Sequence, residues 1–498
     1  MSPTRPQSPP DPFKASKEKS GDALTTSLKA AIAIILSFSV SFALYTLVHV
    51  TSARPAFFRS PDPIHRQQRL GSSAADEPAT NISHIAFGIG GSARTWQSRG
   101  RYSDLWWKPG ATRGFVFLDE EPGRETGRFK IQHRVSSDWR RFRHTAGSDS
   151  AVRIARIVAD LFRTELPEVR WLVMGDDDTI FFPENVAAAL ARYDHRKMVY
   201  VGGSSESVEQ DVMHAYGMAF GGGGFAVSYP LAAGLVSEID GCLDRYHYFY
   251  GSDQRVWACV AEFGVGLSRE PGFHQTDIRG DPFGLLSAHP VAPLASLHHL
   301  DNVNPLFPGK TQLESLTRLF QAYEFDPSRT LQQCFCYHAD RRWSVSVAWG
   351  YAVQIYPLFL TPADLTTPVL TFQTWRTRSN GPFTFNTRRL DPDPCRRPFV
   401  FYMDSVKDSD SGETLTRYLK LAENPNPPQN CDQSYALAMA IEDILVFAPK
   451  MDPGDWKQVQ RPRRHCCEII PTGNNTTQTA GTLRIRVRKC KPAERISI

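Results

Sequence analysis

Three consecutive carboxylates, Asp176, Asp177 and Asp178, have the clearest capacity for chemistry in this 498-residue chain. They follow the uncharged residues 171–175, which predict a buried strand, and Pro183 stands where the first turn of a helix would begin. Neighbouring aspartates repel one another, so three of them at the end of a buried strand favour a divalent cation. The carboxyl end of a strand in an open α/β sheet is also where ligands bind. We therefore predict a cation site at this turn, with an acidic surface turn as the alternative.

The apolar run that ends in these aspartates resembles the Asp-x-Asp motif of metal-dependent, nucleotide-sugar glycosyltransferases with the GT-A fold. It is most similar to the Fringe-type members of glycosyltransferase family 31, and this resemblance covers most of residues 82–498. The resemblance implies Mn²⁺ or another divalent cation as cofactor and a nucleotide sugar as co-substrate. It places Asp176 and Asp178 at the metal, with Asp178 as the direct ligand, and Asp176 and Asp177 near the nucleotide. An EF-hand is excluded because neither its sixth-position Gly nor its late Glu follows Asp176.

Two earlier apolar runs predict strands of the same sheet. Residues 84–91 lead into glycines, which suits the first strand of a nucleotide-binding sheet, although a plain tight turn fits equally well. Residues 114–119 end in Asp119. Fringe-like enzymes have an aspartate in the corresponding place near the uridine, so the resemblance implies a nucleotide contact for Asp119. An N-cap or turn role is the alternative.

Four glycines at 221–224 precede an apolar run that predicts another strand. Glycines carry a large entropy cost, so this stretch indicates that a substrate or the backbone passes close by. Fringe-like enzymes have a Gly-Gly-x-Gly-Phe stretch here that shapes the donor and acceptor pocket. The resemblance therefore implies that Gly222, Gly223 and Gly224 line the nucleotide-sugar site. A flexible glycine turn is the alternative.

Asp253 is the predicted catalytic base. In Fringe-like enzymes a Pro-Asp-Asp-x-Thr-x-Gly loop supplies the base as its second Asp; here Ser252 and Asp253 stand for the acidic pair, and the Thr and Gly are absent. An N-cap for a helix over 254–263 is the structural alternative, and one residue can do both. Cys242 and Cys259 bracket this loop, and a disulfide between them would stiffen it.

The histidine of the metal site is assigned from Phe273-His274, which resembles the Phe-His motif near the end of the family's catalytic domain. His274 is the predicted ligand. The family's ligand is the second His of Phe-His-Ser-His, which is missing here, so His289 or no histidine at all are the alternatives. The polar residues 296–301, which include two more histidines, receive no assignment.

The order of predicted elements indicates the fold class. Strands and helices alternate into the aspartate triplet, as in a doubly wound nucleotide-binding half, so residues 82–325 are predicted as an α/β, GT-A-like (Rossmann-like) domain. Residues 326–498 are rich in β-formers and predict a β-rich region, with strands near 343–356, 369–375, 398–403, 444–449 and 483–489. This layout resembles plant proteins that join a Fringe-related domain to a C-terminal region of unknown function.

The N-terminal part predicts a membrane anchor. Residues 1–29 are expected to be a disordered cytosolic tail, 30–50 a transmembrane helix and 51–81 a stem. A cleaved signal peptide is the rival interpretation for the apolar run. All nine cysteines and the sequons at Asn81, Asn474 and Asn475 follow the span. We therefore expect a single-pass type II protein of the Golgi membrane with disulfides and a lumenal catalytic domain.

The composition and the motifs together predict an enzyme. Lys plus Arg exceed Asp plus Glu by only 5, without a basic block, so no nucleic-acid partner is expected. The predicted activity is metal-dependent, inverting transfer of a sugar from a nucleotide donor, uridine diphosphate by resemblance, to a glycan or glycoprotein acceptor. The rivals are a glycoside hydrolase, which needs no metal on a triplet, and a catalytically inactive, membrane-anchored glycan-binding protein.

Overall fold

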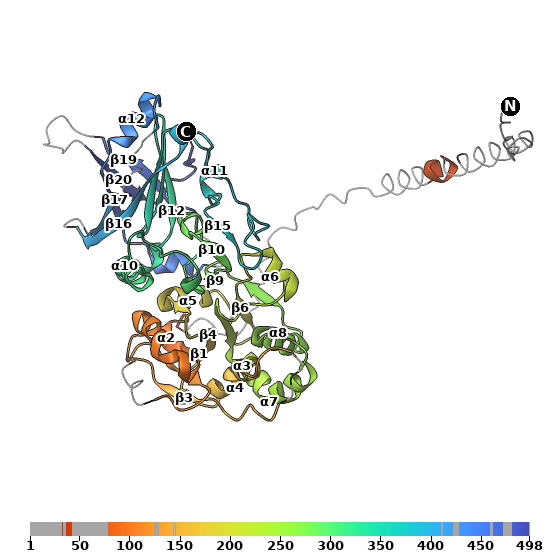
Figure 1. Ribbon diagram of the computed structural model, residues 1–498. Coiled ribbons are helices and arrows are strands. Elements are labelled where there is room, and N and C mark those ends of the chain that lie inside the picture. The colour runs from red at the N-terminus through yellow and green to blue at the C-terminus, as the bar shows by residue number, and fades with distance from the viewer. Residues whose placement is uncertain are drawn as a thin grey trace, which may run out of the picture. The chain divides into compact units, whose positions relative to one another are not determined.

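The computed structural model describes residues 32, 36–41, 78–123, 129–142, 144, 146–409, 412–421, 428–458, 462–471 and 481–497. Most of the predicted tail, span and stem, and the sequons at Asn474 and Asn475, therefore lie outside the described residues. Among the described residues, no helix has the length and apolar character that crossing a bilayer requires. Residues Pro78–Ile498 form one compact unit with two lobes (Figure 1).

The N-terminal lobe is built on a seven-stranded sheet in the order β3-β2-β1-β4-β7-β6-β8. The first four strands are parallel, β7 is antiparallel to both of its neighbours, and β6 is parallel to β8. The strands are β1 (Ile85–Gly90), β2 (Gly114–Leu118), β3 (His133–Val135), β4 (Trp171–Asp176), β6 (Tyr200–Gly202), β7 (Phe225–Ser228) and β8 (Leu267–Arg269). Parallel strands need crossover connections, and helices supply those from β1 to β2 and from β3 to β4.

Helices cover both faces of this sheet, because alternate residues of its buried strands are apolar on both sides. Ile85, Phe87 and Ile89 of β1 face one core with α2 (Ala93–Trp106), α5 (Pro183–Leu190) and α10 (Gln312–Phe325). Ala86 faces the other core with α3 (Asp149–Ala155), α4 (Ile157–Phe162), α7 (Tyr229–Arg245) and α8 (Ser252–Glu262). Gly88 allows α4 to approach, since a Cβ there would lie 3.0 Å from Ile157. The predicted helix over 147–164 is two helices, α3 and α4, that meet at Arg156.

A second, small sheet lies between the aspartate turn and the later part of this lobe. It has the order β5-β11-β9, with β5 (Ile180–Phe181), β11 (Ser296–Leu297) and β9 (Phe273–His274). β11 is antiparallel to β5 and parallel to β9. The residues that follow β11 are thereby brought beside the aspartate turn, although more than 110 residues separate them in the chain. The remaining helices here are α6 (Val208–Met213) and α9 (Phe283–Ser287), with 3-10 turns at Ile82–His84 and Leu300–Asn302.

The C-terminal lobe is an eight-stranded sheet in the order β12-β13-β14-β16-β17-β18-β20-β19. Its strands are β12 (Gln333–His338), β13 (Trp343–Ala348), β14 (Ala352–Tyr356), β16 (Phe399–Asp408), β17 (Glu413–Lys420), β18 (Asp443–Pro449), β19 (Cys466–Ile469) and β20 (Thr482–Arg488). All neighbours are antiparallel except β18 and β20. Its helices are α11 (Pro362–Thr366) and α12 (Gln433–Met439), with 3-10 turns at Pro327–Arg329, Pro394–Arg396 and Pro453–Trp456. In β20 apolar residues are buried and the arginines between them are not, as their alternation predicts.

One strand of the C-terminal region does not join the eight-stranded sheet. β15 (Phe372–Thr374) pairs with β10 (Ile278–Gly280) of the N-terminal lobe, and the two lie side by side between the large sheets (Figure 1). One continuous hydrophobic core also includes α2, α5 and α10 together with β13, β16 and β18. Phe182 stacks on Phe320 within it, with ring centroids 5.1 Å apart. The two lobes therefore share their interior instead of meeting across a solvated linker.

Four disulfides lie among the described residues. The predicted bridge between Cys242 and Cys259 is present and ties α7 to α8. The other three stabilise the C-terminal lobe: Cys336–Cys467, Cys395–Cys431 and Cys466–Cys490. The ninth cysteine, Cys334, is free and buried, which accounts for the odd number in the sequence.

Candidate functional site

The aspartate turn lies at the carboxyl edge of the large sheet. Asp176 ends β4 and is paired with Gly90 of β1, so the predicted glycine turn and the predicted cation site are neighbours. The Asp176 N–H donates to Thr179 Oγ1 at 2.8 Å, and Thr179 Oγ1 donates to the carbonyl of Gly222 at 2.7 Å. These bonds connect the acidic turn to the glycine stretch, which sequence distance alone could not show.

The three aspartates have different partners. Asp177 is buried and accepts hydrogen bonds from Arg99 at 2.8 Å and from Thr95 at 3.0 Å, both on α2. Asp178 is also buried, and its Oδ2 lies 3.2 Å from Arg99. The Asp176 side chain pairs with no arginine or lysine among the described residues, and 35% of its surface is exposed. Asp176 is therefore the member of the triplet whose carboxylate is most open to a ligand, whereas Asp178 is buried with Arg99 beside it.

The histidine that the structure places at this turn is His298. Its Nε2 lies 3.0 Å from Asp178 Oδ1 and 3.8 Å from Asp176 Oδ2. One ligand atom from each of the three side chains falls within 4.8 Å of the other two. His274 is placed elsewhere: its Nδ1 lies 3.2 Å from Glu206, and it is not a member of this group. The expectation that His274 from the Phe-His motif meets the aspartates is therefore corrected: His298 meets them, and metal binding by this group stays a prediction.

The pairing of strands explains this correction. Leu297 is paired with His274 in the parallel β9–β11 ladder, so the residue after Leu297 emerges at the end of that ladder, beside the aspartates. The alternative, His289, is buried with its Nδ1 2.8 Å from the carbonyl of Pro290, and burial lowers its pKa well below the usual value. The sequence held one signal, the His298-His299 pair after a short apolar strand, but no motif assigned that pair a role.

Charge and burial shift the pKa values of the two open carboxyls in opposite directions. Surrounding protein atoms desolvate Asp176 and raise its pKa to about 7; His298 opposes this rise, and the charges of Asp178 and Asp177 add to it. Burial alone would also raise the pKa of Asp178, but the charge and hydrogen bond of His298, with Arg99, hold it below its ordinary value. Burial lowers the pKa of His298, and Asp178 more than offsets this, so the pKa of His298 is raised. Asp176 is the carboxylate of this group whose negative charge is compensated least.

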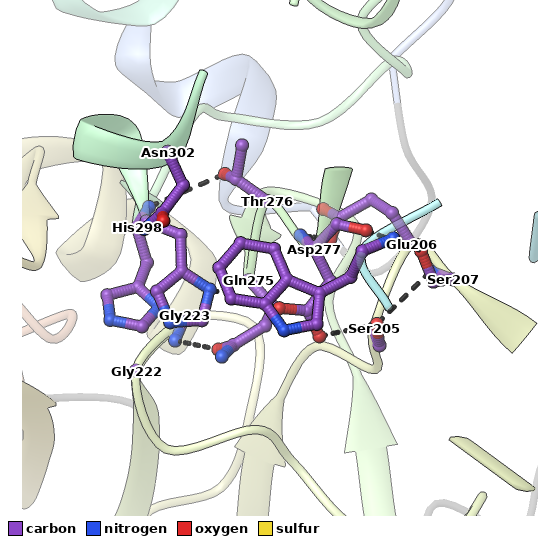
Figure 2. Close-up of polar contacts among 12 residues, drawn as sticks. Ser205, Glu206, Ser207, Gly222, Gly223, Gln275, Thr276, Asp277, His298 and Asn302 are labelled. Carbon is purple, nitrogen blue, oxygen red and sulfur yellow. Dashed lines mark hydrogen bonds and ion pairs between the residues drawn. The ribbon is translucent and has the colours of Figure 1, made fainter. Parts of the chain in front are cut away.

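The glycines bring the backbone close to the protein's own side chains. A Cβ on Gly222 would lie 2.0 Å from Cε1 of His298, so only glycine leaves room for that ring. The Gly223 N–H donates to Gln275, as Figure 2 shows, and the Gly223 carbonyl accepts from Ser296. Gly224 has φ +85°, in the region that favours glycine. These contacts account for the glycine run; contact of the same residues with a nucleotide sugar stays a prediction.

Asp253 lies in the first turn of α8, and Gly251, not Asp253, occupies the N-cap position. Its carboxylate accepts hydrogen bonds from the N–H groups of Gly221 at 3.2 Å and Gln254 at 3.0 Å. Asp253 and Asp176 line the same small cavity. Burial raises the pKa of Asp253, although the N–H of Gly221 opposes this. The carboxylate is thus fixed in place and, with a raised pKa, is a stronger base than a solvated aspartate.

Asp119 ends the run that forms β2, and it binds the start of α2. It accepts hydrogen bonds from the N–H of Ala93 at 2.8 Å and from Ser92 Oγ at 3.3 Å. Burial would raise the pKa of Asp119, but the bond from Ala93 helps to lower it. Its capping role is therefore visible, and its nucleotide contact stays a prediction.

Arg153 of α3 is a charged residue of this region that sequence reasoning missed. It is buried, and its Nη1 donates to the carbonyl of Phe117 at 3.0 Å and to Ser136 at 3.3 Å. Burial lowers its pKa, and the charges of Asp119 and Asp176 act against that shift. The arginine thus places a positive charge behind the acidic edge of the sheet. Its position within an apolar helix pattern carried no signal of this role.

Two family models match the sequence. The model described as "Protein of unknown function, DUF604" matches residues 210–467, just over half of the chain. The chain belongs to the DUF604 family. The Fringe-like model matches residues 124–277, which include the aspartate triplet, the glycine run and Asp253. The mixed α/β N-terminal lobe of this DUF604 protein thus includes a segment similar to the Fringe-like family.

The chain is also similar to part of a solved structure. The catalytic domain of Drosophila beta1,4galactosyltransferase 7, in complex with xylobiose, is similar at 14% sequence identity and a TM-score of 0.23. The similarity covers 37% of this chain and 64% of that domain, just under two thirds of it. No curated protein matches the sequence. The DUF604 match itself begins in α6 and ends in β19, so it includes parts of both lobes.

Proposed function

We propose that this DUF604 protein is a metal-dependent, inverting glycosyltransferase that moves a sugar from a nucleotide donor, a uridine diphosphate sugar, to a hydroxyl of a glycan or glycoprotein. The observation that supports it best is the convergence of Asp176, Asp178 and His298 within 4.8 Å, beside a cavity that Asp176 shares with Asp253. The Fringe-like match over the same residues supports the reaction class.

The donor set fits a divalent cation such as Mn²⁺. Two carboxylates and one imidazole offer the oxygen and nitrogen ligands that suit such ions. Asp176, Asp178 and His298 would hold the cation, and the raised pKa of Asp176 reflects a desolvated carboxylate that pairs with no arginine or lysine among the described residues. When bound, the cation would supply a Lewis acid that neutralises the charge of a diphosphate leaving group.

The residues of the chain itself would perform the proton transfer and the positioning. Asp253 would accept the proton of the acceptor hydroxyl, a general-base contribution typically worth about 10²–10⁴ in rate. The N–H groups of Gly221 and Gln254 hold its carboxylate in one orientation. Gly222, which has no Cβ, lets the backbone pack directly against the ring of His298. Arg99 neutralises Asp177 and supports Asp178, which leaves Asp176 open to the ligand.

The proposal includes a place in the secretory pathway. Four disulfides among the described residues support an oxidising compartment. Asn81 of the first sequon is exposed, as a glycosylation site must be. With the apolar run at 30–50, these features support a single-pass type II protein of the Golgi membrane with a lumenal catalytic unit. Localisation of a C-terminally tagged chain, with protease protection of the tag, tests this part separately.

The activity is tested by release of uridine diphosphate from a panel of nucleotide sugars by the purified full chain, with Mn²⁺ and with EDTA. We expect Mn²⁺-dependent release that Asp178→Asn and His298→Ala abolish, whereas His338→Ala, on the far edge strand β12, retains it. Donor or glycan binding without any release would support the inactive glycan-binding protein. Metal-independent hydrolysis of a glycoside would support a hydrolase.

A further inference from the structure

A segment of the C-terminal region, residues 372–385, lies against the loops that support the candidate metal site. Beyond the β10–β15 pairing, the N–H of Thr384 donates to the carbonyl of Glu206 at 3.0 Å. The N–H of Val208 donates to Pro382 at 3.3 Å, and Ser207 forms a β-bridge with Phe383. Backbone bonds therefore fix this segment to residues 206–208 of the N-terminal lobe.

Trp375 is the residue of this segment that reaches toward the histidines. Its ring stacks on His299, with centroids 4.2 Å apart and planes inclined by 7°. The guanidinium of Arg279 lies 4.2 Å from the centroid of the Trp375 ring. Arg279 Nε also donates to the Trp375 carbonyl at 3.0 Å, and the Trp375 N–H donates to Ser207 at 3.2 Å. The partly buried Trp375 ring therefore contacts both a histidine and an arginine of the protein itself.

The stack continues to the ligand histidine. The ring of His299 lies 3.8 Å from that of His298, and Nε2 of His298 points at Asp178 and Asp176. A metal-binding histidine usually donates its other ring N–H to a fixed acceptor, and that bond sets its orientation. Nδ1 of His298 is buried and has no hydrogen-bond partner among the described residues. Besides the contact of its Nε2 with Asp178, packing against Gly222 and His299 therefore orients this ring.

A buried polar network fixes His299 in turn. Its Nδ1 lies 3.0 Å from Asp277 Oδ1, and Asp277 Oδ2 accepts from Ser205 at 2.7 Å. The N–H of Asp277 donates to Glu206 at 3.0 Å, and its carbonyl accepts from Ser207, as Figure 2 shows for the labelled residues. His299 itself has φ +52°, in the left-handed region that residues other than glycine uncommonly adopt. The network holds one edge of the His299 ring, and Trp375 covers one face.

We propose that Trp375 is a positioning residue for His298, so that the C-terminal region completes the candidate metal centre of the N-terminal lobe. This inference rests on the proposed function, because it assumes that His298 is a metal ligand. It gives the C-terminal region a role that a separate appendage would not have. Trp375 orients, through His299, the one ligand whose second nitrogen has no partner among the described residues to orient it.

The test is Mn²⁺ binding to the full chain, measured by isothermal titration calorimetry and by the loss of the free-ion EPR signal. Trp375→Leu removes the stacking ring and is expected to weaken Mn²⁺ binding by about tenfold or more, in the range found when residues that support metal ligands are changed. Trp375→Phe keeps a stacking ring and should stay within about threefold of the wild type. Phe385→Leu is the matched control: it lies in the same segment but packs on Phe372 and Phe383, and should leave binding unchanged.

The outcomes separate this inference from the proposed function. A wild-type chain that does not bind Mn²⁺ overturns both. A wild-type chain that binds Mn²⁺, with Trp375→Leu binding equally well, overturns the positioning role alone. If Trp375→Leu shows no cooperative unfolding transition, His299→Leu tests the same contacts, and unchanged affinity in that variant overturns the inference. Loss in Trp375→Leu together with rescue by Trp375→Phe supports it.

Discussion

Asparagine substitutions at Asp176 and Asp178 are expected to change the stability of the metal-free protein in opposite directions. Burial raises the pKa of Asp176 to about 7, so its charged form opposes folding. This penalty is absent below the ordinary pKa of an aspartate, grows as the pH rises and is complete above about pH 7. The pKa of Asp178 is instead lowered: although burial opposes this, His298 and Arg99 stabilise its charged form. Its contribution is present above the ordinary pKa and is lost as the pH falls through its folded value.

The size of the Asp176 effect follows from the shift. A rise from 3.8 to about 7 in a fully buried group would correspond to about 4 kcal/mol at about 1.36 kcal/mol per unit. Because 35% of the side-chain surface is exposed, solvent screening reduces this, and we expect a gain of about 1–2 kcal/mol for Asp176→Asn at pH 8. For Asp178→Asn, which breaks a buried ion pair, we expect a loss of about 2 kcal/mol.

Differential scanning calorimetry of the EDTA-treated chain measures both effects. For a unit of this size each kcal/mol moves Tm by about 1 °C, so the variants should differ from each other by about 3–4 °C at pH 8. The gain from Asp176→Asn should fade toward pH 4, where the wild-type carboxyl is protonated in both states. Added Mn²⁺ should raise the Tm of the wild type above that of Asp176→Asn, since it stabilises the wild type and not the variants. Equal Tm values for the two variants at pH 8, or a less stable Asp176→Asn, would refute the assignment of the least compensated charge to Asp176.

Three further results are expected. Gly222→Ala should weaken Mn²⁺ binding at least tenfold in calorimetry, because its Cβ would lie 2.0 Å from His298. Gly221→Ala is the control: its Cβ would lie 3.5 Å from the nearest atom, in Asp253, so this variant should bind Mn²⁺ normally. Equal affinities of the two variants would contradict the close packing at Gly222. Asp253→Asn should lower the rate of sugar transfer about 10²-fold or more while donor binding is retained. The wild-type rate should fall as the pH is lowered, because Asp253, whose pKa is raised by burial, becomes protonated. A rate that does not change at low pH would count against Asp253 as the base. The Mn²⁺ affinity of the wild type should fall as the pH drops below about 7, where Asp176 takes up a proton, and a pH-independent titration would exclude it as a ligand.

Local patterns were enough to predict much of the N-terminal lobe. The buried strand before Asp176 and the α/β order are present because apolar runs and turn residues act over a few positions. The bridge between Cys242 and Cys259 also forms as predicted. Where one helix was expected over 147–164, the chain forms two, a break at Arg156 that its unbroken apolar spacing did not signal.

The C-terminal lobe was predicted less completely. Its β-rich character follows from composition, but β12, β17 and β19 were missed, and the run at 343–356 is two strands around a turn at Gly350. β15 was expected among the strands of this region, and it pairs with the other lobe instead. The sequence of a short strand does not predict its partner strand, because pairing depends on which sheet edge the rest of the chain leaves unpaired.

The sequence by itself determined which residue types are available at the acidic turn, because an apolar strand, three aspartates and a glycine run are local facts. Only the tertiary structure decided that His298, not His274, meets those aspartates, since a parallel ladder between β9 and β11 carries the chain there across more than 110 residues. It also decided that Trp375, 197 positions after Asp178, belongs to the same stack of rings. Contacts of this kind arise from strand pairing and packing between distant segments, and no local spacing encodes them.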